Sequence, residues 1–581
     1  MKVSDYIARF LVAERVPCVF EMSGGMITHL LDSIYSLGGP RILSVHHEQA
    51  AAFAADAVGR MTGIPGVAMA TSGPGATNLL TGIGSCYFDS APAVFITGQV
   101  NRNEQKGERA VRQLGFQETD IVSMALPITK ASWLVRDERE VPELLRRAFA
   151  LAVEGRPGPV LLDIPMDVQR ADIEAFSAAT DATPAVTNDA ANEADELDES
   201  VWDDLFAQLG AARRPLILVG GGVRASLAIE PLRSFVQRVR VPVVNSLLAV
   251  DVLPYEDRLR VGMLGSYGNR WANHAVGRSD FLLVLGSRLD VRQTGAETKA
   301  FKGERAIFHV DCERGEINNR VVGCRAVVSE LGDFLARANR QAEERRFEER
   351  VEWLAEINDL RREWPDTREL AEVPGINPNV LMHQLSRVSA SASAYVVDVG
   401  QHQMWAAQSL ELNAEQRFLT SGGMGSMGYS LPAAIGAAIS DPARAVVLIA
   451  GDGGFQSNIQ ELQTVARNRL PLKMVIVNNN CHGMVRQFQQ SYFDERYQST
   501  LWGYSAPDFE KVAGAYGIDA RTVAEASEVE AALGWLWESP DAPALLQVMV
   551  DTYANAYPKI AFGHPLTEME PFAKPLDMEG T

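Results

Sequence analysis

The sequence predicts an α/β protein with three doubly wound parallel-sheet domains. Short apolar runs typical of buried parallel strands alternate with amphipathic helical patterns along most of the chain, which is the signature of βαβ units. The chain has 581 residues, several times the length of a usual domain of about 100–200 residues. Two segments of different composition divide it, so we expect three domains.

The two dividing segments differ in character. Residues 171–200 are rich in Ala, Thr, Asp and Asn and predict an exposed linker. Residues 340–370 are rich in Glu and Arg with a helical pattern, and predict a solvated helix between two domains. The expected divisions are an N-terminal domain at 1–170, a central domain at 195–340, a third domain at 375–555 and a tail at 556–581. The first and third domains are candidates for distant copies of one architecture.

Composition and charge restrict the class of partner. Hydrophobic residues make up 46% of the chain and charged residues 22%, as in ordinary soluble globular proteins. A net charge of −20 would repel nucleic acid and anionic membranes. We therefore expect small-molecule substrates, with no nucleic acid and no membrane as partners.

The cysteines and the N-terminus indicate the compartment. Five cysteines without CxxC spacing favour free thiols in a reducing environment. The charged start of the chain lacks the pattern of a signal peptide, and no apolar run reaches the about 18 residues of a membrane span. These features predict a cytoplasmic protein.

A candidate metal site lies in the third domain. A buried strand at 445–450 runs into Gly451-Asp452-Gly453-Gly454, and a second strand at 473–477 leads to Asn478-Asn479. Because parallel strands end at the same edge of a sheet, Asp452 and Asn479 are expected to meet there. Their oxygens suit Mg²⁺, and the glycines allow backbone N–H groups to approach a diphosphate. The alternative is an ordinary glycine turn.

Gly-Asp-Gly followed 27 positions later by Asn479 resembles the motif of thiamine-diphosphate enzymes. The resemblance implies that Asp452 and the Asn479 side chain hold Mg²⁺, with the main-chain carbonyl of Cys481 as a further ligand. It also implies that Gly453, Gly454 and Met484 contact the cofactor.

Glu48 is the candidate activating group. A strand at 42–45 leads to His46-His47-Glu48-Gln49, and a helix of small residues follows at 50–61. A lone glutamate at a strand end is usually solvated. In the thiamine-diphosphate family, a glutamate at this place hydrogen-bonds N1′ of the aminopyrimidine and so promotes removal of the thiazolium C2 proton. Desolvation raises the pKa of such a carboxyl group toward a useful range.

The glycine-rich segment 422–428 precedes a second helix of small residues at 431–439. It is similar to the family segment that contacts the pyrimidine. This similarity implies that Gly425 offers a main-chain oxygen to N4′ and that Met427 is the apolar wedge beneath the cofactor. The alternative is a loop that only permits close packing.

Segments 71–78, 115–118 and 400–408 resemble the acetolactate synthase large subunit in particular, and the resemblance spans nearly the whole chain. It implies that Val399, Gly400, Gln401 and His402 line the diphosphate, and that Gly25 and Gln117 lie on the substrate side. It also places the cofactor between the first domain of one subunit and the third of another, as a homodimer or homotetramer.

The central domain resembles the FAD-binding domain of that family through glycine-rich segments at 220–222, 262–265 and 286–295. One such turn alone suits any nucleotide or none. The flavin would be structural, because carboligation involves no net electron transfer. The implied flavin contacts are Gly220, Gly221, Gly222, Ser246, Leu247, Gly286, Arg288, Asp290, Arg292 and Asp311.

Two departures from the family concern the substrate. Met26 and Phe488 stand where the family usually has Ala and Trp, near the acceptor pocket. Arg292 is also a candidate for binding an acceptor carboxylate. The preferred function is decarboxylation of pyruvate and transfer of the acetyl unit to a carbonyl acceptor.

Three alternatives remain open from the sequence. The first keeps the pyruvate donor and transfers the two-carbon unit to a nucleotide-linked keto-sugar. The second is a phosphonopyruvate-like or oxalyl-CoA-like decarboxylase. The third is an inactive flavin-binding scaffold or regulatory subunit, against which the presence of Glu48, Asp452 and Asn479 argues.

Overall fold

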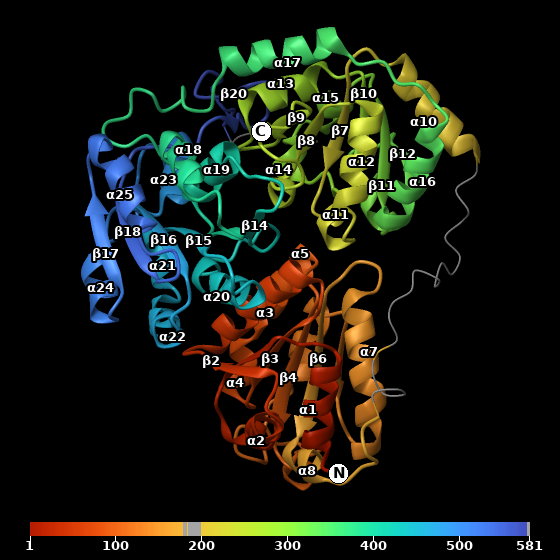
Figure 1. Cartoon of the computed structure of the whole chain (residues 1–581), viewed down its shortest axis with the longest axis vertical. Coiled ribbons are helices and arrows are strands. Elements are labelled where there is room, and N and C mark those ends of the chain that lie inside the picture. The colour runs from red at the N-terminus through yellow and green to blue at the C-terminus, as the bar shows by residue number, and fades with distance from the viewer. Residues whose placement is uncertain (178–182, 184–198, 578–581) are drawn as a thin grey trace.

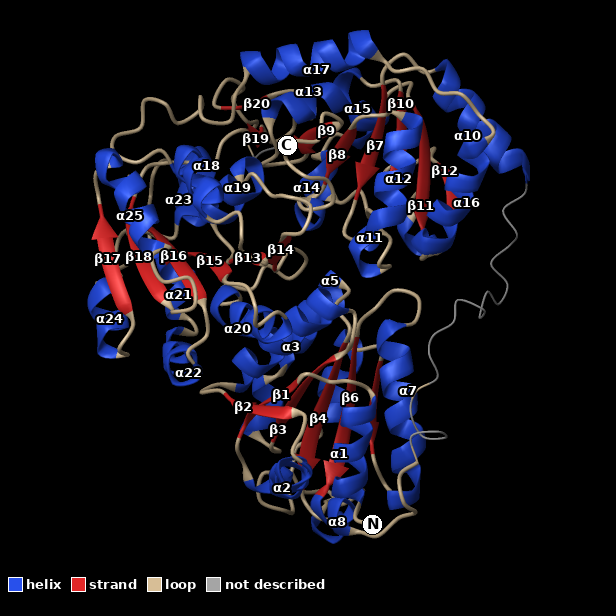
Figure 2. Cartoon of the chain, viewed as in Figure 1, coloured by secondary structure: helices blue, strands red, loops and turns tan. Residues whose placement is uncertain are grey.

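The computed structural model describes residues 1–177, 183 and 199–577. It contains three six-stranded parallel sheets flanked by helices (Figure 2). The first domain lies at the bottom of Figure 1, the central domain at the upper right and the third at the upper left. The predicted α/β class with three parallel-sheet domains is confirmed. Most of the predicted linker, 178–182 and 184–198, lies outside the described residues.

The first and third sheets share one strand order. It is β2-β1-β3-β4-β6-β5 in the first sheet and β14-β13-β15-β16-β18-β17 in the third. Counted within each domain, the two orders are the same, as expected for two copies of one architecture. The strands are β1 (Cys18–Met22), β2 (Arg41–Ser44), β3 (Gly66–Ala70), β4 (Ala93–Gln99), β5 (Ala131–Leu134), β6 (Pro159–Pro165), β13 (Ala394–Val397), β14 (Arg417–Thr420), β15 (Val446–Gly451), β16 (Leu472–Asn478), β17 (Asp519–Val523) and β18 (Ala544–Met549).

The central sheet has a different order, β12-β11-β10-β7-β8-β9. Counted from its other edge within the domain, this is the doubly wound order 3-2-1-4-5-6 of dinucleotide-binding folds. Its strands are β7 (Pro215–Val219), β8 (Val243–Asn245), β9 (Arg260–Met263), β10 (Phe281–Leu285), β11 (Ala306–Asp311) and β12 (Arg325–Val328).

Helices cover the three sheets. The longer ones are α1 (Val3–Ala13), α2 (Thr28–Leu37), α3 (Glu48–Thr62), α5 (Leu80–Asp89), α7 (Val141–Val153), α10 (Glu199–Ala211), α12 (Ile229–Val239), α13 (Arg270–Arg278), α16 (Leu331–Glu343), α17 (Val351–Glu363), α18 (Pro378–Val388), α19 (Gln401–Ser409), α20 (Ser430–Ser440), α23 (Gly483–Tyr492) and α25 (Val529–Leu536). None of the helices in the described residues combines the length and the apolar character needed to cross a membrane.

The two helices of small residues pack against each other. Helix α3 of the first domain and α20 of the third lie side by side in Figure 1 and bury their alanines in one shared core. A Cβ at Gly436 of α20 would lie 2.2 Å from the Ala54 carbonyl oxygen of α3. Only glycine permits so close an approach of backbones. This contact joins the first and third domains within one chain.

The solvated connecting helix predicted at 340–370 is wrong in two respects. Helix α16 ends at Glu343, and a loop separates it from α17. Helix α17 also buries Trp353, Ile357 and Leu360 in a core with the central sheet, and the Trp353 Nε1–H donates to the Pro215 carbonyl at 3.1 Å. Although the segment is rich in charged residues, three apolar residues lie along one side of the helix. They are enough to bury that side against the central domain.

The C-terminal segment returns from the third domain to the central one. Its short strands β19 (Lys559–Ile560) and β20 (Met569–Glu570) pair antiparallel. The Ile560 N–H donates to the Ser266 carbonyl at 2.9 Å, and the Arg270 guanidinium donates to the Glu570 carbonyl at 2.9 Å. The Ser491 hydroxyl of the third domain also donates to Glu570 Oε2 at 3.2 Å, so this segment packs on both domains.

Candidate active site

In each sheet the strand order reverses beside the first strand of the domain. These points lie between β1 and β3, between β13 and β15, and between β7 and β10. Ligands of open parallel sheets bind at such points, outside the carboxyl ends of the strands. The segments that the sequence singles out follow these strands and the strands beside them, so the topology gathers them into three clusters.

The first cluster contains three oxygens at the edge of the third sheet. Asp452 begins the short helix α21 (Asp452–Gln456) after β15, and Asn479 follows β16. The Asn479 side-chain oxygen lies 3.2 Å from Asp452 Oδ1 and 2.9 Å from the Cys481 carbonyl oxygen. Burial raises the pKa of Asp452 to about 6. Oxygens that converge in this way suit a bound cation such as Mg²⁺.

Tyr504 and Gln401 complete the surroundings of these oxygens. The Tyr504 hydroxyl donates to Asp452 Oδ2 at 2.8 Å, and Asn479 Nδ2 donates to Gln401 Oε1 at 3.0 Å. Sequence reasoning missed Tyr504, because it lies in a loop 52 positions from Asp452 without a recognisable motif.

No group of three or more His, Cys, Asp or Glu side chains suitable for a metal occurs in the described part of the chain. A metal at Asp452 would therefore have one carboxylate and two neutral oxygens from the protein. Mg²⁺ is commonly held in this way, with waters and substrate phosphates filling the other positions. The residues present thus fit Mg²⁺ together with a diphosphate.

His402 supplies independent support for a ligand at this edge. Its ring lies between two glycines, since a Cβ at Gly400 would be 2.5 Å and one at Gly451 2.8 Å from ring atoms. Burial lowers the pKa of His402 to about 3, so the ring is neutral. Its buried Nε2 has no hydrogen-bond partner among the described residues. A diphosphate oxygen would satisfy an N–H at this position.

Asp398 joins the end of β13 to the glycine-rich loop. This carboxylate is fully buried and accepts from the backbone N–H groups of Val399 at 2.9 Å, Gly428 at 3.0 Å and Ser430 at 2.9 Å. A Cβ at Gly454 would lie 2.4 Å from Asp398 Oδ1. Asp398 was not predicted, although its place at the end of β13 was a possible signal.

The glycine-rich loop follows β14 and leads into α20. Gly425 has a left-handed φ of 68°, a conformation that favours glycine. The Met427 side chain is 40% exposed, while Met424 reaches the first domain, where its Sδ would be 2.9 Å from a Cβ at Gly84. The loop thus presents apolar side chains near the boundary between domains.

The second cluster surrounds Glu48, the first residue of α3. Glu48 is 7% exposed, and Asn78 Nδ2 donates to its Oε2 at 3.0 Å. A Cβ at Gly75 would lie 3.3 Å from the other carboxylate oxygen. Glu48 is therefore buried beside the loop that follows β3, and its carboxylate accepts a hydrogen bond from the Asn78 side chain.

Gly25 and Gln117 belong to the same edge as Glu48. Gln117 adopts a left-handed φ of 65° and packs against Gly73, where a Cβ would lie 3.0 Å from its own. Gly25 is exposed and begins the short 3-10 helix Gly25–Ile27 after β1, and the next residue, Met26, donates its N–H to Thr71 Oγ1 at 3.3 Å.

Two predicted residues of the third domain lie on α23: Met484, predicted to contact the cofactor, and Phe488, predicted to lie near the acceptor pocket. Met484 is half-buried near its start. The Phe488 side chain is 36% exposed, and its ring lies 4.8 Å from that of Tyr492. Phe488 and Met26 belong to different domains. No hydrogen bond within the described residues joins Glu48 to Asp452, Asn479 or Cys481.

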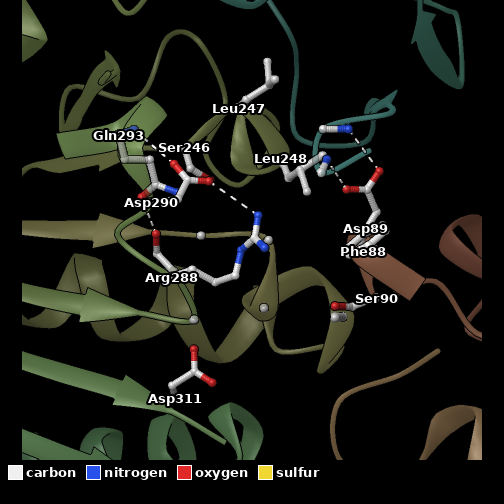
Figure 3. A pocket seen from close by; sticks show the side chains of 18 of the residues that line it. Phe88, Asp89, Ser90, Ser246, Leu247, Leu248, Arg288, Asp290, Gln293 and Asp311 are labelled. Atoms are coloured by element: carbon white, nitrogen blue, oxygen red, sulfur yellow. Dashed lines mark hydrogen bonds and ion pairs between the residues drawn. The ribbon is translucent and has the colours of Figure 1, made fainter. Parts of the chain in front are cut away.

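The third cluster is a pocket between the central and first domains (Figure 3), and Met404, Gly422 and Gly423 of the third domain also line it. All ten residues predicted to contact a flavin line it, from the turns after β7, β8, β10 and β11. Phe88, Asp89 and Ser90 of the first domain close the opposite side. Gly220 has a packing role too, because a Cβ there would lie 2.1 Å from the Gly286 carbonyl oxygen.

Family models match each of the three regions. Residues 1–124 match the N-terminal TPP binding domain of thiamine pyrophosphate enzymes, 202–338 their central domain and 398–548 their C-terminal TPP binding domain. Thiamine pyrophosphate and thiamine diphosphate are two names of one compound.

Curated relatives match over nearly the whole chain. The acetolactate synthase large subunit of Parasynechococcus marenigrum (strain WH8102) is 39% identical over 561 residues, covering 95% of this chain and 88% of the relative. The isozyme 2 large subunit of Escherichia coli (strain K12) is 36% identical, covering 98% of this chain and 99% of its own. The isozyme 1 large subunit of the same organism is 36% identical, with 97% of both chains covered. The resemblance seen in the motifs is confirmed: the chain belongs to the acetolactate synthase large-subunit family of thiamine-diphosphate-dependent enzymes.

Proposed function

We propose that this enzyme decarboxylates pyruvate and transfers the remaining acetyl unit to the carbonyl carbon of a second 2-oxo acid. The observation that carries the proposal is the convergence of the Asp452, Asn479 and Cys481 oxygens at one sheet edge, in a chain that also buries Glu48 at the corresponding edge of its first domain. The relatives named acetolactate synthase support a 2-oxo acid acceptor over a nucleotide-linked keto-sugar. They also argue against an inactive scaffold.

Thiamine diphosphate would supply the electron sink that stabilises the acyl carbanion. Mg²⁺ would be held by Asp452, Asn479 and the Cys481 carbonyl, and His402 would face the diphosphate. Glu48 would hold a proton at N1′ of the aminopyrimidine, in a site from which burial excludes most water. Gly425 and Met427 would orient the pyrimidine ring.

FAD is the proposed occupant of the central pocket. The doubly wound strand order and the glycine turns after β7 and β10 support a dinucleotide. Arg288 pairs with Asp290 at 3.4 Å on the pocket wall (Figure 3), and Asp290 also caps α14 (Val291–Thr294). The flavin would be structural, and absorbance of the purified protein near the flavin bands would reveal it.

A homodimer or homotetramer is proposed, because Glu48 forms no hydrogen bond to Asp452, Asn479 or Cys481 within the described residues. Apolar side chains are exposed on the glycine-rich loop and on α23 of the third domain: Met424, Met427 and Phe488 are 36–43% exposed. A second copy would cover this surface and complete the site.

Cytoplasmic location is proposed because all five cysteines are free thiols.

The experiment that tests the function is incubation of the protein with pyruvate, thiamine diphosphate, Mg²⁺ and FAD, with products identified by mass spectrometry. The proposal expects 2-acetolactate and one CO₂ for each molecule formed. Acetaldehyde as the main product would indicate a simple decarboxylase and contradict the proposed carboligation.

We expect Phe488→Trp to change acceptor selection. The larger indole, which carries an N–H, would reshape the exposed end of α23 that faces the second carbonyl compound. One change in a pocket is worth about 10–200-fold in discrimination, so product ratios should shift toward acetolactate-type products when 2-oxo acids and bulkier ketones compete at fixed pyruvate. Equal product ratios for variant and parent would show that this position does not select the acceptor.

A further inference from the structure

Three buried side-chain amides connect the candidate metal site to the backbone of the C-terminal segment. They belong to Gln487, Gln401 and Asn479, and with the Ala556 peptide they form what we call the amide series. The Ala556 N–H donates to Gln487 Oε1 at 2.9 Å, and Gln487 Nε2 donates to the Ala556 carbonyl at 3.0 Å. A backbone N–H only donates, so this pair fixes which end of the Gln487 amide is oxygen.

The fixed oxygen of Gln487 determines the next two amides. Gln401 Nε2 donates to Gln487 Oε1 at 3.1 Å, which turns Gln401 Oε1 toward Asn479. Asn479 Nδ2 then donates to that oxygen at 3.0 Å. The Asn479 oxygen is left pointing at Asp452 Oδ1 and the Cys481 carbonyl.

The opposite orientation of Asn479 would satisfy these two oxygens locally, with Nδ2 donating to both. It would also require Gln401 to turn, and Gln401 Oε1 would then face Gln487 Oε1 across 3.1 Å. The Cys481 N–H, which donates to the Asn479 oxygen at 3.3 Å, would lose its acceptor. The series therefore favours the orientation that presents oxygen to a cation.

Because the amide series is buried, the loss of any one of its hydrogen bonds should disturb the others. Gln401 is 3% and Gln487 2% exposed, so water has little access to replace a lost partner. A Cβ at Gly483 would lie 1.9 Å from Gln401 Oε1. The first residue of α23 must therefore be glycine, because any larger side chain would block the contact between Gln401 and Asn479.

We propose that Gln487 is a positioning residue for the metal: through Gln401 it holds the Asn479 oxygen toward the cation, with the Ala556 backbone as the fixed reference. This rests on the proposed function, of which the metal is a part. Outer-shell partners that orient metal ligands typically change metal affinity by about 10–100-fold when removed. We expect a loss of that size from Gln487→Met, which keeps the length of the side chain and removes its hydrogen bonds.

The test is a calorimetric titration of the full-length protein with Mg²⁺ at saturating thiamine diphosphate, repeated with Mn²⁺ by electron paramagnetic resonance. Gln408→Met is the matched control. Gln408 lies on α19 with Gln401, is 2% exposed, and donates to the Tyr557 carbonyl at 3.1 Å. It therefore anchors the same C-terminal segment from outside the amide series, and its variant should keep the parent's metal affinity.

Gln401→Met provides a second variant that interrupts the series and leaves the pair of Gln487 with Ala556 intact. It should weaken Mg²⁺ binding about as much as Gln487→Met, and it decides the matter if Gln487→Met does not fold. Parent-like Mg²⁺ affinity in the folded variants, or an equal loss in Gln408→Met, would overturn the proposal. If the parent itself binds no Mg²⁺, the proposed metal site fails and the positioning role fails with it, which is a distinct result.

Discussion

Replacement of Glu48 by glutamine should slow deprotonation of the cofactor at C2 by about 10²–10⁴-fold, the usual contribution of a positioned proton-transfer group. The amide cannot supply the proton that N1′ requires. It can still accept the hydrogen bond from Asn78 Nδ2, which now goes to Glu48 Oε2 at 3.0 Å. Folding and cofactor binding should therefore stay close to those of the parent.

Hydrogen–deuterium exchange at C2 of the bound cofactor, followed by rapid quench and NMR, measures this step directly. Asn78→Ala is a useful companion, because it removes the donor to Glu48 and leaves the carboxyl group in place. Its effect should be much smaller. Unchanged exchange in Glu48→Gln would remove Glu48 from the proposed role.

The second large effect is expected from Asp452→Ala. Asp452 is the one carboxylate among the three oxygens of the candidate metal site, so its loss removes the negative charge that would offset the cation. Mg²⁺-dependent binding of thiamine diphosphate should weaken by more than the about 10–100-fold typical of outer-shell changes. The Tyr504 hydroxyl, which donates to Asp452 at 2.8 Å, would also lose its acceptor.

Titration of the apo-protein with thiamine diphosphate at several Mg²⁺ concentrations checks this expectation. Tyr504→Phe serves as the control, since it removes the hydrogen bond to Asp452 and preserves the carboxylate. Equal cofactor affinities for Asp452→Ala and the parent would refute Asp452 as a metal ligand.

The sequence was sufficient to predict the three sheets, because strand and helix periodicities alternate so regularly. It also brought Asp452 and Asn479 together, since the ends of neighbouring parallel strands must share an edge. The predicted flavin residues come from four separate turns, and the topology gathers all of them around one pocket.

Other contacts could not be predicted because they depend on tertiary packing without a sequence period. Tyr504 reaches Asp452 from a loop, and Gln487 meets Ala556 across 69 positions. The prediction that α17 is solvated was wrong for a related reason. Its segment is rich in charged residues, and composition alone does not show that Trp353 lies on a face that packs against the central sheet. Long-range hydrogen bonds of this kind are decided by how the domains pack.

We expect Glu48 of one copy and Asp452 of another to act on the same cofactor. Mixed oligomers of Glu48→Gln and Asp452→Ala chains, isolated through two different tags, test it most directly by their rate of 2-acetolactate formation. In a mixed dimer, one site carries both substitutions and the other carries neither, so about half of the parent activity should return. Activity that stays at the level of the single variants would mean that each site is formed within one chain, and that Glu48 and Asp452 of different copies do not share a cofactor.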